Sequence, residues 1–377
     1  MENTQKTDSL PTPIHVIDMR VIHNNIEVLK VIKKETGCKI LFAVKGFSCD
    51  PILSVISNEV DGFSASSVFE VMLARSYGVK YVQVHSPAIK KTDDLQLSGL
   101  SDCVILNSIS QWRSFHDSIL KSHAQLGIRI NPEYSIVENY KVDPCHQYSR
   151  FGIRSNEINL IDLSTISGVL FHNMCEHGAE ELSETLRIIG EKFANLLHMV
   201  KWVNIGGGQL FTDENYDIKK AIIALQNFQD EFDVDLYMEP CTAIMYKSGC
   251  LLTSVVDCVK NGMETAILDA SAICHLPDIV NFPYRSEIRN AYEPFERQYT
   301  YRLAGPSCYS GDIFGDYSFD EPLQVGDKLQ ILDTAQYSMV KSIWFNGIPL
   351  PSVAVQMDDQ TITIVKQYSY KEYKEFI

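Results

Sequence analysis

A single lysine follows a short apolar run near the N-terminus. Residues 40–44 read Ile-Leu-Phe-Ala-Val, and Lys45 and a glycine come next. A continuous apolar run of this length is typical of a parallel strand that is covered on both faces. A desolvated lysine at the carboxyl end of such a strand lies where barrel enzymes carry their chemistry, and its amine can form a Schiff base with a carbonyl. Taken alone, Lys45 could also be merely the first polar residue after a strand.

Further polar residues and glycines follow other apolar runs in the same way. Together they match the requirements of pyridoxal 5'-phosphate: a lysine for the Schiff base, glycines for the phosphate, an imidazole to stack on the ring and a carboxylate facing the ring nitrogen. The glycines are not a nucleotide P-loop, because no Gly-Lys-Ser/Thr follows them. Singly, the imidazole, the carboxylate and the glycines could be a paired core histidine, a buried acid and a flexible loop. The residues are Ser64, Ser66, Arg129, His172, Gly206, Gly207, Gly208 and Glu239.

Eight short apolar runs alternate with helix-length segments over the first two thirds of the chain. This βα alternation predicts a parallel sheet, and eight units over roughly 200 residues predict a closed (β/α)8 barrel rather than the alternative, a doubly wound open sheet. The expected strands are 40–44, 62–65, 81–85, 103–107, 126–131, 168–172, 202–205 and 235–239.

Beyond about Tyr246 the pattern changes to Val-, Ile- and Leu-rich segments with few helical stretches, which predicts an antiparallel β domain. We therefore expect an α/β fold with a barrel over residues 30–245 and a β domain formed by residues 1–29 and 246–377. The expected strands are 13–18, 250–259, 265–269, 328–334 and 361–365.

Composition excludes several classes of function. The net charge of −15 argues against a nucleic-acid partner, which requires clustered basic surface. The sequence has no signal peptide and no run of about 18 apolar residues, so no membrane segment is expected. The 10 cysteines show no CxxC pair and no metal-like spacing, which predicts reduced thiols in a cytoplasmic protein without a metal site.

Several longer motifs, in this order, give the chain a recognisable pattern. With them the sequence resembles the carboxynorspermidine decarboxylases, which are related to ornithine and diaminopimelate decarboxylases and are fold-type III enzymes on an alanine-racemase-like barrel. The likeness extends from about Thr12 to Tyr373. The motifs are FAVKGFS (42–48), SRFGIR (149–154), WVNIGGG (202–208), ILDASAICHLPD (267–278), GPSCYSGD (305–312) and FNGIPLPS (345–352).

The resemblance implies a role for individual residues. Lys45 corresponds to the lysine that forms the Schiff base, His172 to the stacking imidazole and Glu239 to the partner of the ring nitrogen. Gly206–Gly208 and Tyr337 correspond to phosphate ligands. Cys308 is similar to a cysteine that enters the site from the other protomer of a homodimer and protonates the carbon that has lost CO2; otherwise it is a packed thiol.

Two aspartates, Asp278 and Asp312, could contact a substrate amine, and each could instead cap a loop. The implied activity is removal of the α-carboxylate from a 3-amino-3-carboxypropyl group, in a small-molecule substrate with an α-amino acid head group, to leave an aminopropyl group. A racemase would want arginine rather than Glu239 at the ring nitrogen and no protonating cysteine. A non-catalytic pyridoxal-phosphate-binding protein would be a lone barrel without the last 130 or so residues.

The sequence departs from the family pattern around one pocket. Gln209 and Leu210 stand where the family has two histidines, Thr242 lies where it has Gly-Glu-Ala, and Gln336 replaces a histidine. Loss of an acidic residue and of three histidines predicts that the distal part of the substrate differs from a polyamine. The alternative substrate is an aminocarboxypropylated phosphate of a microcin C-type peptide nucleotide, since a phosphate would repel a pocket carboxylate.

Overall fold

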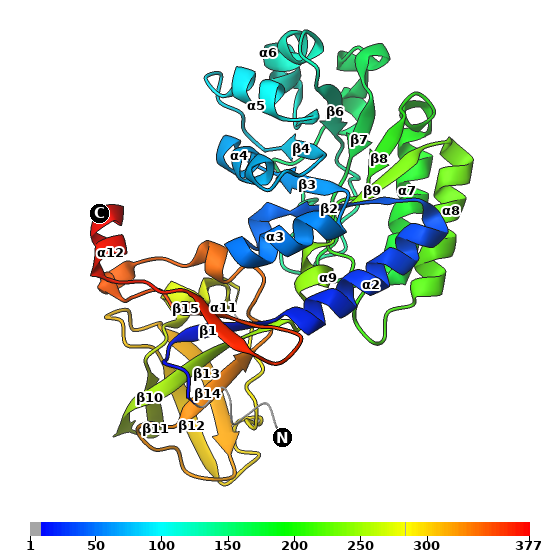
Figure 1. The fold of residues 1–377 in the computed structure, drawn as a ribbon. Helices are drawn as coiled ribbons and strands as arrows, with labels where there is room; N and C mark the ends of the chain where they lie inside the picture. Colours follow the sequence, from blue (N-terminus) through cyan, green and yellow to red (C-terminus); the bar gives the residue numbers. More distant parts are fainter. Residues whose placement is uncertain (1–8, 283) are drawn as a thin grey trace. The chain divides into compact units, whose positions relative to one another are not determined.

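The computed structural model describes residues 9–282 and 284–377, which form two compact units. One unit is Asn25–Ile244, and the other combines the described residues up to Asn24 with Met245–Ile377. The chain thus enters the unit Asn25–Ile244 within helix α2 (Met19–Thr36) and leaves it within helix α9 (Cys241–Met245). Figure 1 shows the elements in chain order.

The unit Asn25–Ile244 is a closed barrel of eight parallel strands in sequential order. The barrel closes because β2 pairs with β9 as well as with β3, through Lys39 opposite Tyr237. The predicted fold class is confirmed, and the open-sheet alternative is wrong. The strands are β2 (Lys39–Ala43), β3 (Gly62–Ala65), β4 (Val82–His85), β5 (Cys103–Leu106), β6 (Gln125–Arg129), β7 (Gly168–Leu170), β8 (Trp202–Asn204) and β9 (Asp235–Met238).

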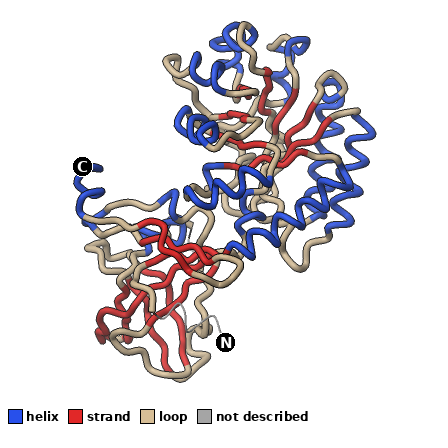
Figure 2. Tube along the Cα trace, viewed as in Figure 1, coloured by secondary structure: helices blue, strands red, loops and turns tan. Residues whose placement is uncertain are grey.

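Helices lie outside the barrel strands, as Figure 2 shows by colour. Two of them begin at a serine cap: the Ser67 and Ser108 hydroxyls accept from the backbone N–H of Glu70 and Gln111, which fixes where each chain segment leaves its strand. The helices are α2, α3 (Asp50–Glu59), α4 (Val68–Ser76), α5 (Asp94–Leu100), α6 (Ile109–Leu120), α7 (Ala179–Leu197), α8 (Ile218–Phe232) and α9.

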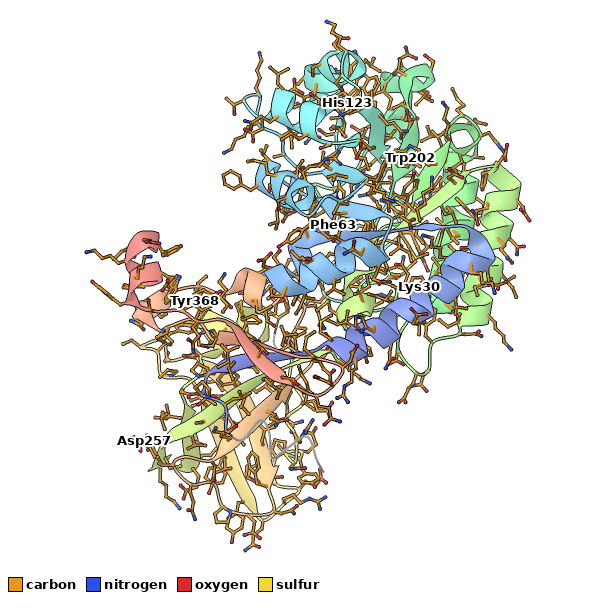
Figure 3. The ribbon with its side chains drawn as sticks, viewed as in Figure 1. Lys30, Phe63, His123, Trp202, Asp257 and Tyr368 are labelled. Carbon is orange, nitrogen blue, oxygen red and sulfur yellow. The ribbon has the colours of Figure 1, made fainter. Side chains whose placement is uncertain are left out.

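The indole of Trp202 belongs to the buried cluster of the barrel core and needs two glycines beside it. Figure 3 labels Trp202 among the side chains of this unit. A Cβ on Gly168 would lie 2.0 Å from the indole, and a Cβ on Gly127 would lie 2.8 Å from it. Either alanine substitution would therefore overpack the core. The indole Nε1 donates to the Gln125 side chain at 3.0 Å, so the buried ring leaves no polar atom unpaired.

The second unit is built on a mostly antiparallel sheet, which confirms the predicted β domain. Strand β1 (Ile14–Asp18) lies inside it, antiparallel to β10 and parallel to β15. The other strands are β10 (Gly249–Asn261), β11 (Met263–Leu268), β12 (Tyr299–Ala304), β13 (Ile313–Phe319), β14 (Lys328–Leu332), β15 (Ser352–Gln356) and β16 (Ile362–Lys366), with helices α10 (Ala272–His275), α11 (Pro277–Asn281) and α12 (Tyr370–Phe376).

Over residues 9–282 and 284–377, no helix combines the length and the apolar character that crossing a membrane requires.

Candidate active site

Lys45 lies just beyond β2, in the single 3-10 turn Val44–Gly46. Strand β2 is buried at Leu41, Phe42 and Ala43, so Lys45 is attached to a well-packed strand by a short turn. The residue is exposed in this structure, in contrast to the desolvated lysine expected from the sequence. Its charge still reaches the barrel interior, because it lowers the pKa of the buried Glu239 and of the half-buried His172.

Glu239 follows β9 and forms the centre of a buried hydrogen-bond network. Its Oε1 accepts from Asn204 Nδ2 at 2.8 Å, and its Oε2 lies 3.3 Å from Nε2 of His85. The same nitrogen of His85 lies 3.2 Å from the Ser64 hydroxyl. Because β3, β4, β8 and β9 each contribute at or beside their carboxyl ends, the polar residues converge where a barrel carries its chemistry.

The carboxyl group of Glu239 is ionised at neutral pH. Burial alone would raise its pKa, but the neighbouring His85, Lys45 and Asn204 outweigh burial and lower the pKa to about 2. A buried carboxylate held in this way offers a fixed negative charge. It can therefore keep a proton on a nitrogen base that is brought against it.

His172 follows β7 and is half-buried, with its Nδ1 atom buried. Burial, with smaller contributions from the charges of Lys45 and Arg129, lowers its pKa to about 3, so its imidazole is neutral. No described residue lies within hydrogen-bond distance of its Nδ1. A neutral ring with an unpaired edge suits packing against a flat aromatic group.

The three glycines after β8 make a backbone cradle that no side chain could share. A Cβ on Gly206, Gly207 or Gly208 would lie 2.6, 2.4 or 2.2 Å from the carbonyl oxygen of Phe171, Glu239 or Met174, respectively. Gly206 and Gly208 also have φ angles of +69° and +90°, which glycine adopts without strain.

The N–H groups of this cradle are partly free. Gly206 N–H donates to Asn204 Oδ1, whereas in the described part of the chain Gly207 and Gly208 N–H donate to no acceptor. Two adjacent free N–H groups in a half-buried glycine turn form an anion-binding concavity. The residues present thus fit a phosphorylated cofactor.

The SRFGIR motif folds back on the end of β6. Ile153 N–H donates to Arg129 C=O at 2.8 Å, and Asn131 Nδ2 donates to Phe151 C=O at 2.7 Å. The Phe151 ring then lies 4.4 Å from the guanidinium carbon of Arg129 and 4.4 Å from that of Arg150. Burial lowers the pKa of Arg129 to about 10, so the residue remains a cation at neutral pH.

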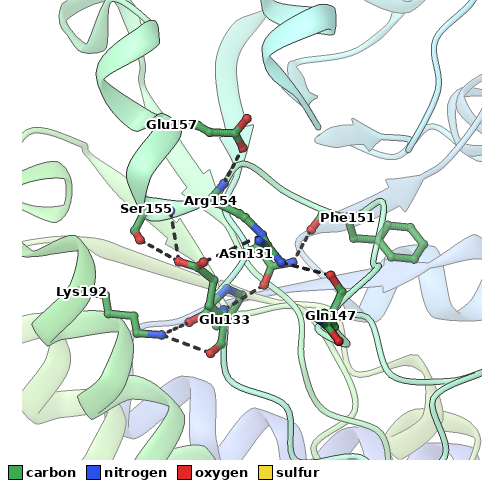
Figure 4. A network of polar contacts seen from close by, with 9 residues as sticks. Asn131, Glu133, Gln147, Phe151, Arg154, Ser155, Glu157 and Lys192 are labelled. Atoms are coloured by element: carbon green, nitrogen blue, oxygen red, sulfur yellow. Dashed lines mark hydrogen bonds and ion pairs between the residues drawn. The ribbon is translucent and has the colours of Figure 1, made fainter.

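The loop that follows β6 is fixed by the contacts drawn in Figure 4. Lys192 of α7 donates to the carbonyl oxygens of Pro132 and Glu133, and Ser155 donates to the Glu133 carboxylate at 2.7 Å. Because Lys192 belongs to α7, this helix helps to determine where the barrel loop runs.

Two predicted substrate residues lie in the barrel unit. Gln209 is fully buried beside the glycine cradle; its Nε2 donates to Ile205 C=O at 3.4 Å, and its Oε1 has no partner among the described residues. Thr242, at the start of α9, is half-buried. Cys241 next to it is buried, and burial raises the pKa of its thiol to about 12, so it is not a nucleophile.

Cys308, Gln336 and Tyr337 belong to the sheet unit. Cys308 is exposed, and its backbone N–H donates at 2.8 Å to the side chain of Asn346, so the GPSC and FNG motifs hold each other. Gln336 donates to Asp333 Oδ1 at 3.1 Å. Tyr337 has a φ angle of +57°, a left-handed conformation that is uncommon for a residue with a bulky side chain.

The two aspartates of the same unit are both engaged by protein groups. Asp312 is 2% exposed, and its carboxylate accepts from Ser271 Oγ, Ile273 N–H and Ser307 N–H. These contacts support the loop-capping alternative for Asp312. Asp278 forms an ion pair with Lys341 at 2.5 Å, and the same Lys341 amine lies 5.0 Å from the centroid of the Tyr337 ring.

Sequence reasoning missed His85 and Asn204 as members of the site. His85 ends a predicted strand, so the rule that singled out His172 would also have found it. Asn204 is the last residue of β8, immediately before the glycine motif, but an asparagine in an apolar run gives no signal of its own. Its importance depends on Gln83 and Glu239, two partners from distant strands.

Comparison with known proteins identifies the class of enzyme. The family model of the pyridoxal-dependent decarboxylases, C-terminal sheet domain, matches residues 16–335. The chain therefore belongs to the pyridoxal-dependent decarboxylase family. The protein is a decarboxylase, and its cofactor is pyridoxal 5'-phosphate.

Two full-length relatives are more specific. The carboxynorspermidine/carboxyspermidine decarboxylase of Campylobacter jejuni subsp. jejuni serotype O:6 is 34% identical over 377 residues, covering 97% of this chain and 98% of the relative. The carboxyaminopropylagmatine decarboxylase of Synechocystis sp. is 34% identical over 371 residues, covering 98% of this chain and 96% of the relative.

A crystal structure of carboxynorspermidine decarboxylase from Campylobacter jejuni, complexed with norspermidine, matches with a TM-score of 0.90 at 33% identity, covering 98% of this chain and 100% of that one. Diaminopimelate decarboxylase from Helicobacter pylori matches with a TM-score of 0.83 at 20% identity, covering 99% of this chain and 100% of that one, a likeness of fold alone.

Proposed function

We propose that this decarboxylase removes the α-carboxylate of a 3-amino-3-carboxypropyl group on a polyamine-type substrate and leaves an aminopropyl group. The observation that carries this proposal is the full-length similarity to two enzymes whose names both specify a carboxylated aminopropyl compound. The buried Glu239 network and the glycine cradle support the same chemistry, because they supply an anion and free N–H donors beside each other.

The cofactor, when bound, supplies an electron sink for the bond that breaks. In this proposal Lys45 provides the amine that links to the cofactor and His172 packs its neutral ring against the cofactor ring. Gly207 and Gly208 N–H bind the phosphate. Glu239 holds a proton on the ring nitrogen, and Tyr337 contributes to phosphate binding.

We infer that the working enzyme is a cytoplasmic homodimer with shared active sites, in which Cys308 serves the site of the partner chain. The exposed position of Cys308 and the ten free thiols support this inference. The cofactor, when bound, would take up the electron pair that the departing CO2 leaves at Cα. The Cys308 thiol then gives Cα a proton, and solvent reprotonates the thiolate.

Mixing two inactive variants tests the shared site. Lys45→Ala and Cys308→Ala homodimers each carry two defective sites, whereas a mixed dimer carries one site with both defects and one intact site. Random exchange of subunits should therefore restore about a quarter of the wild-type activity. No recovery after exchange confirmed by mass spectrometry would contradict the shared site.

The nucleotide-tailoring alternative has no support among the relatives named above, and we do not propose it. It rested on Gln209, Leu210, Thr242 and Gln336. The side chains of Gln209 and Gln336 each donate to neighbouring protein groups, Ile205 C=O and Asp333.

Substrate turnover tests the proposal directly. We expect CO2 release from carboxynorspermidine or carboxyspermidine, with kcat/KM at least about 100-fold higher than for an aminocarboxypropyl phosphate ester, a difference worth about 3 kcal/mol of transition-state binding. Higher kcat/KM on the phosphate ester would overturn the proposed substrate. Racemisation without CO2 release would overturn the proposed reaction.

A further inference from the structure

Two side chains, those of Asn204 and His85, contact the carboxylate of Glu239, and they differ in the hydrogen bonds that they can form. The Glu239 side chain is 4% exposed and the His85 side chain 8%, so water contributes little to either. Asn204 Nδ2 donates to Oε1 at 2.8 Å, and His85 Nε2 faces Oε2 at 3.3 Å. A carboxylate has about four acceptor positions, so Glu239 keeps room for one further donor.

The orientation of the Asn204 side-chain amide is fixed by its hydrogen bonds. One Nδ2 hydrogen goes to Glu239, the other goes to Gln83 Oε1 at 2.5 Å, and Oδ1 accepts from Gly206 N–H at 2.8 Å. Turning the amide over would place its oxygen against two acceptors and its NH2 against a donor. Asn204 therefore stays in one orientation and carries no charge, so it aims the carboxylate without responding to it.

His85 can form either of two hydrogen bonds through its Nε2 atom. Its Nε2 faces both Glu239 Oε2 at 3.3 Å and Ser64 Oγ at 3.2 Å. If Nε2 carries a proton, it donates to the carboxylate and the Ser64 hydroxyl turns elsewhere. If Nε2 is bare, Ser64 donates to it, and the nitrogen lone pair then faces a negatively charged oxygen. An ionised Glu239 therefore favours the form of His85 that has a proton on Nε2.

We propose that His85 is a positioning residue of this decarboxylase, which keeps Glu239 ionised and correctly aimed by donating from Nε2. The proposal rests on the proposed role of Glu239 at the cofactor ring nitrogen. His85 is suited to this task because its side chain takes no part in the proposed reaction. Lys45 also lowers the pKa of Glu239, but it is the residue proposed to react with the cofactor and so cannot supply a constant charge.

The charges around His85 are consistent with that assignment. The carboxyl groups of Glu239 and of Glu70 on α4 both interact electrostatically with His85, and the imidazole of His172 is neutral. Among the neighbours that lower the pKa of Glu239 against the effect of burial, His85 contributes most. The Glu70 carboxylate accepts from Ser66 N–H at 2.6 Å, so it is held beside its own helix start.

The test measures the protonation of the ring nitrogen rather than turnover. Apoenzyme is loaded with pyridoxal 5'-phosphate labelled with 15N in the ring, and the nitrogen shift is followed against pH in wild type and in His85→Ala, with His116→Gln as a control histidine on α6. We expect the midpoint of ring deprotonation to fall by about one pH unit or more in His85→Ala, a tenfold or larger effect. An unchanged midpoint in folded His85→Ala overturns the proposal.

A double-mutant cycle separates action through Glu239 from a direct effect. In wild type, His85→Ala should weaken cofactor affinity about 10- to 100-fold, the range for losing a charge-assisted hydrogen bond. In the Glu239→Gln background the same change should cost less than about 3-fold. Equal losses in both backgrounds would mean that His85 does not act through Glu239, which overturns the proposal.

A second variant covers the case in which His85→Ala does not fold. His85→Gln retains an N–H donor at similar reach and should recover part of the midpoint and of the affinity, whereas a midpoint identical to wild type would overturn the role of the imidazole. None of these measurements uses a substrate. If no aminocarboxypropyl compound is decarboxylated, the proposed substrate fails while the His85 result still stands.

Discussion

His15 gives the sheet unit a built-in sensitivity to acid. It lies in β1 between β10 and β15, opposite Leu251 and Val353, and is 1% exposed. Neither of its ring nitrogens has a hydrogen-bond partner among the described residues. Burial, together with the nearby His275, lowers its pKa from 6.5 to about 3. The His15→Leu substitution keeps a similar volume and removes the titration.

Proton linkage gives the sign and size of the effect of His15 on the free energy of unfolding. The folded state disfavours the charged imidazole, so stability is complete above the unfolded pKa of 6.5 and is lost as the pH falls toward the folded pKa of about 3. At pH 5 the unfolded state has bound the proton and the folded state has not. One such group then costs about 2 kcal/mol relative to pH 8.

Thermal unfolding followed by calorimetry at pH 8 and pH 5 measures this cost. Other groups titrate in both proteins, so the difference in Tm between His15→Leu and wild type should grow by roughly 4–8 °C at the lower pH. The exposed His123→Gln serves as the control. An equal difference in Tm at both pH values would refute the reasoning, because it would show that His15 does not titrate differently in the two states.

Two further predictions concern the cofactor site. Lys45→Ala should abolish the visible absorbance of the bound cofactor and covalent capture by borohydride; retention of either would remove Lys45 from its proposed role. Gly207→Ala places a Cβ 2.4 Å from the Glu239 carbonyl oxygen, so the backbone must shift and cofactor affinity, measured by equilibrium dialysis, should fall at least about 10-fold. Gly99→Ala, at a glycine with open space around it and no left-handed φ, is the control and should leave that affinity unchanged.

The regular alternation of apolar runs with helix-length segments made the barrel predictable from sequence. The sheet unit has no such alternation, and part of it could not be predicted. Each barrel strand is buried on both faces and reads as an apolar run, so all eight were found within a residue or two. Strands β12 and β13 mix Arg302, Asp316 and aromatic residues because one face is exposed, and they gave no comparable signal. Val44 belongs to the 3-10 turn that carries Lys45, although the sequence predicts it as the last residue of a strand. An apolar residue such as valine does not distinguish a strand end from a buried turn.

Residue type alone could single out candidate site residues, but it could not find residues whose chemistry depends on pairing. A lysine, three glycines and a glutamate at strand ends stand out in a one-dimensional pattern. The contacts of Glu239 with His85 and Asn204 span 154 and 35 positions, respectively. Asn204 ends the neighbouring strand β8, whereas His85 ends β4 and approaches Glu239 only because the barrel closes. The same holds for Lys341, whose ion pair with Asp278 has no signature in either local sequence.

The place of β1 within its sheet has a consequence for how the chain is made. Its neighbours β10 and β15 begin at Gly249 and Ser352, so β1 leaves the ribosome long before either strand that pairs with it exists. At about 5–20 residues per second, β1 waits roughly 20–70 s for β15. The barrel, whose successive strands pair with one another, can close during that time. Its completion ahead of the sheet would leave β1 as an unpaired strand edge on the nascent chain, where a chaperone or a second nascent copy could capture it.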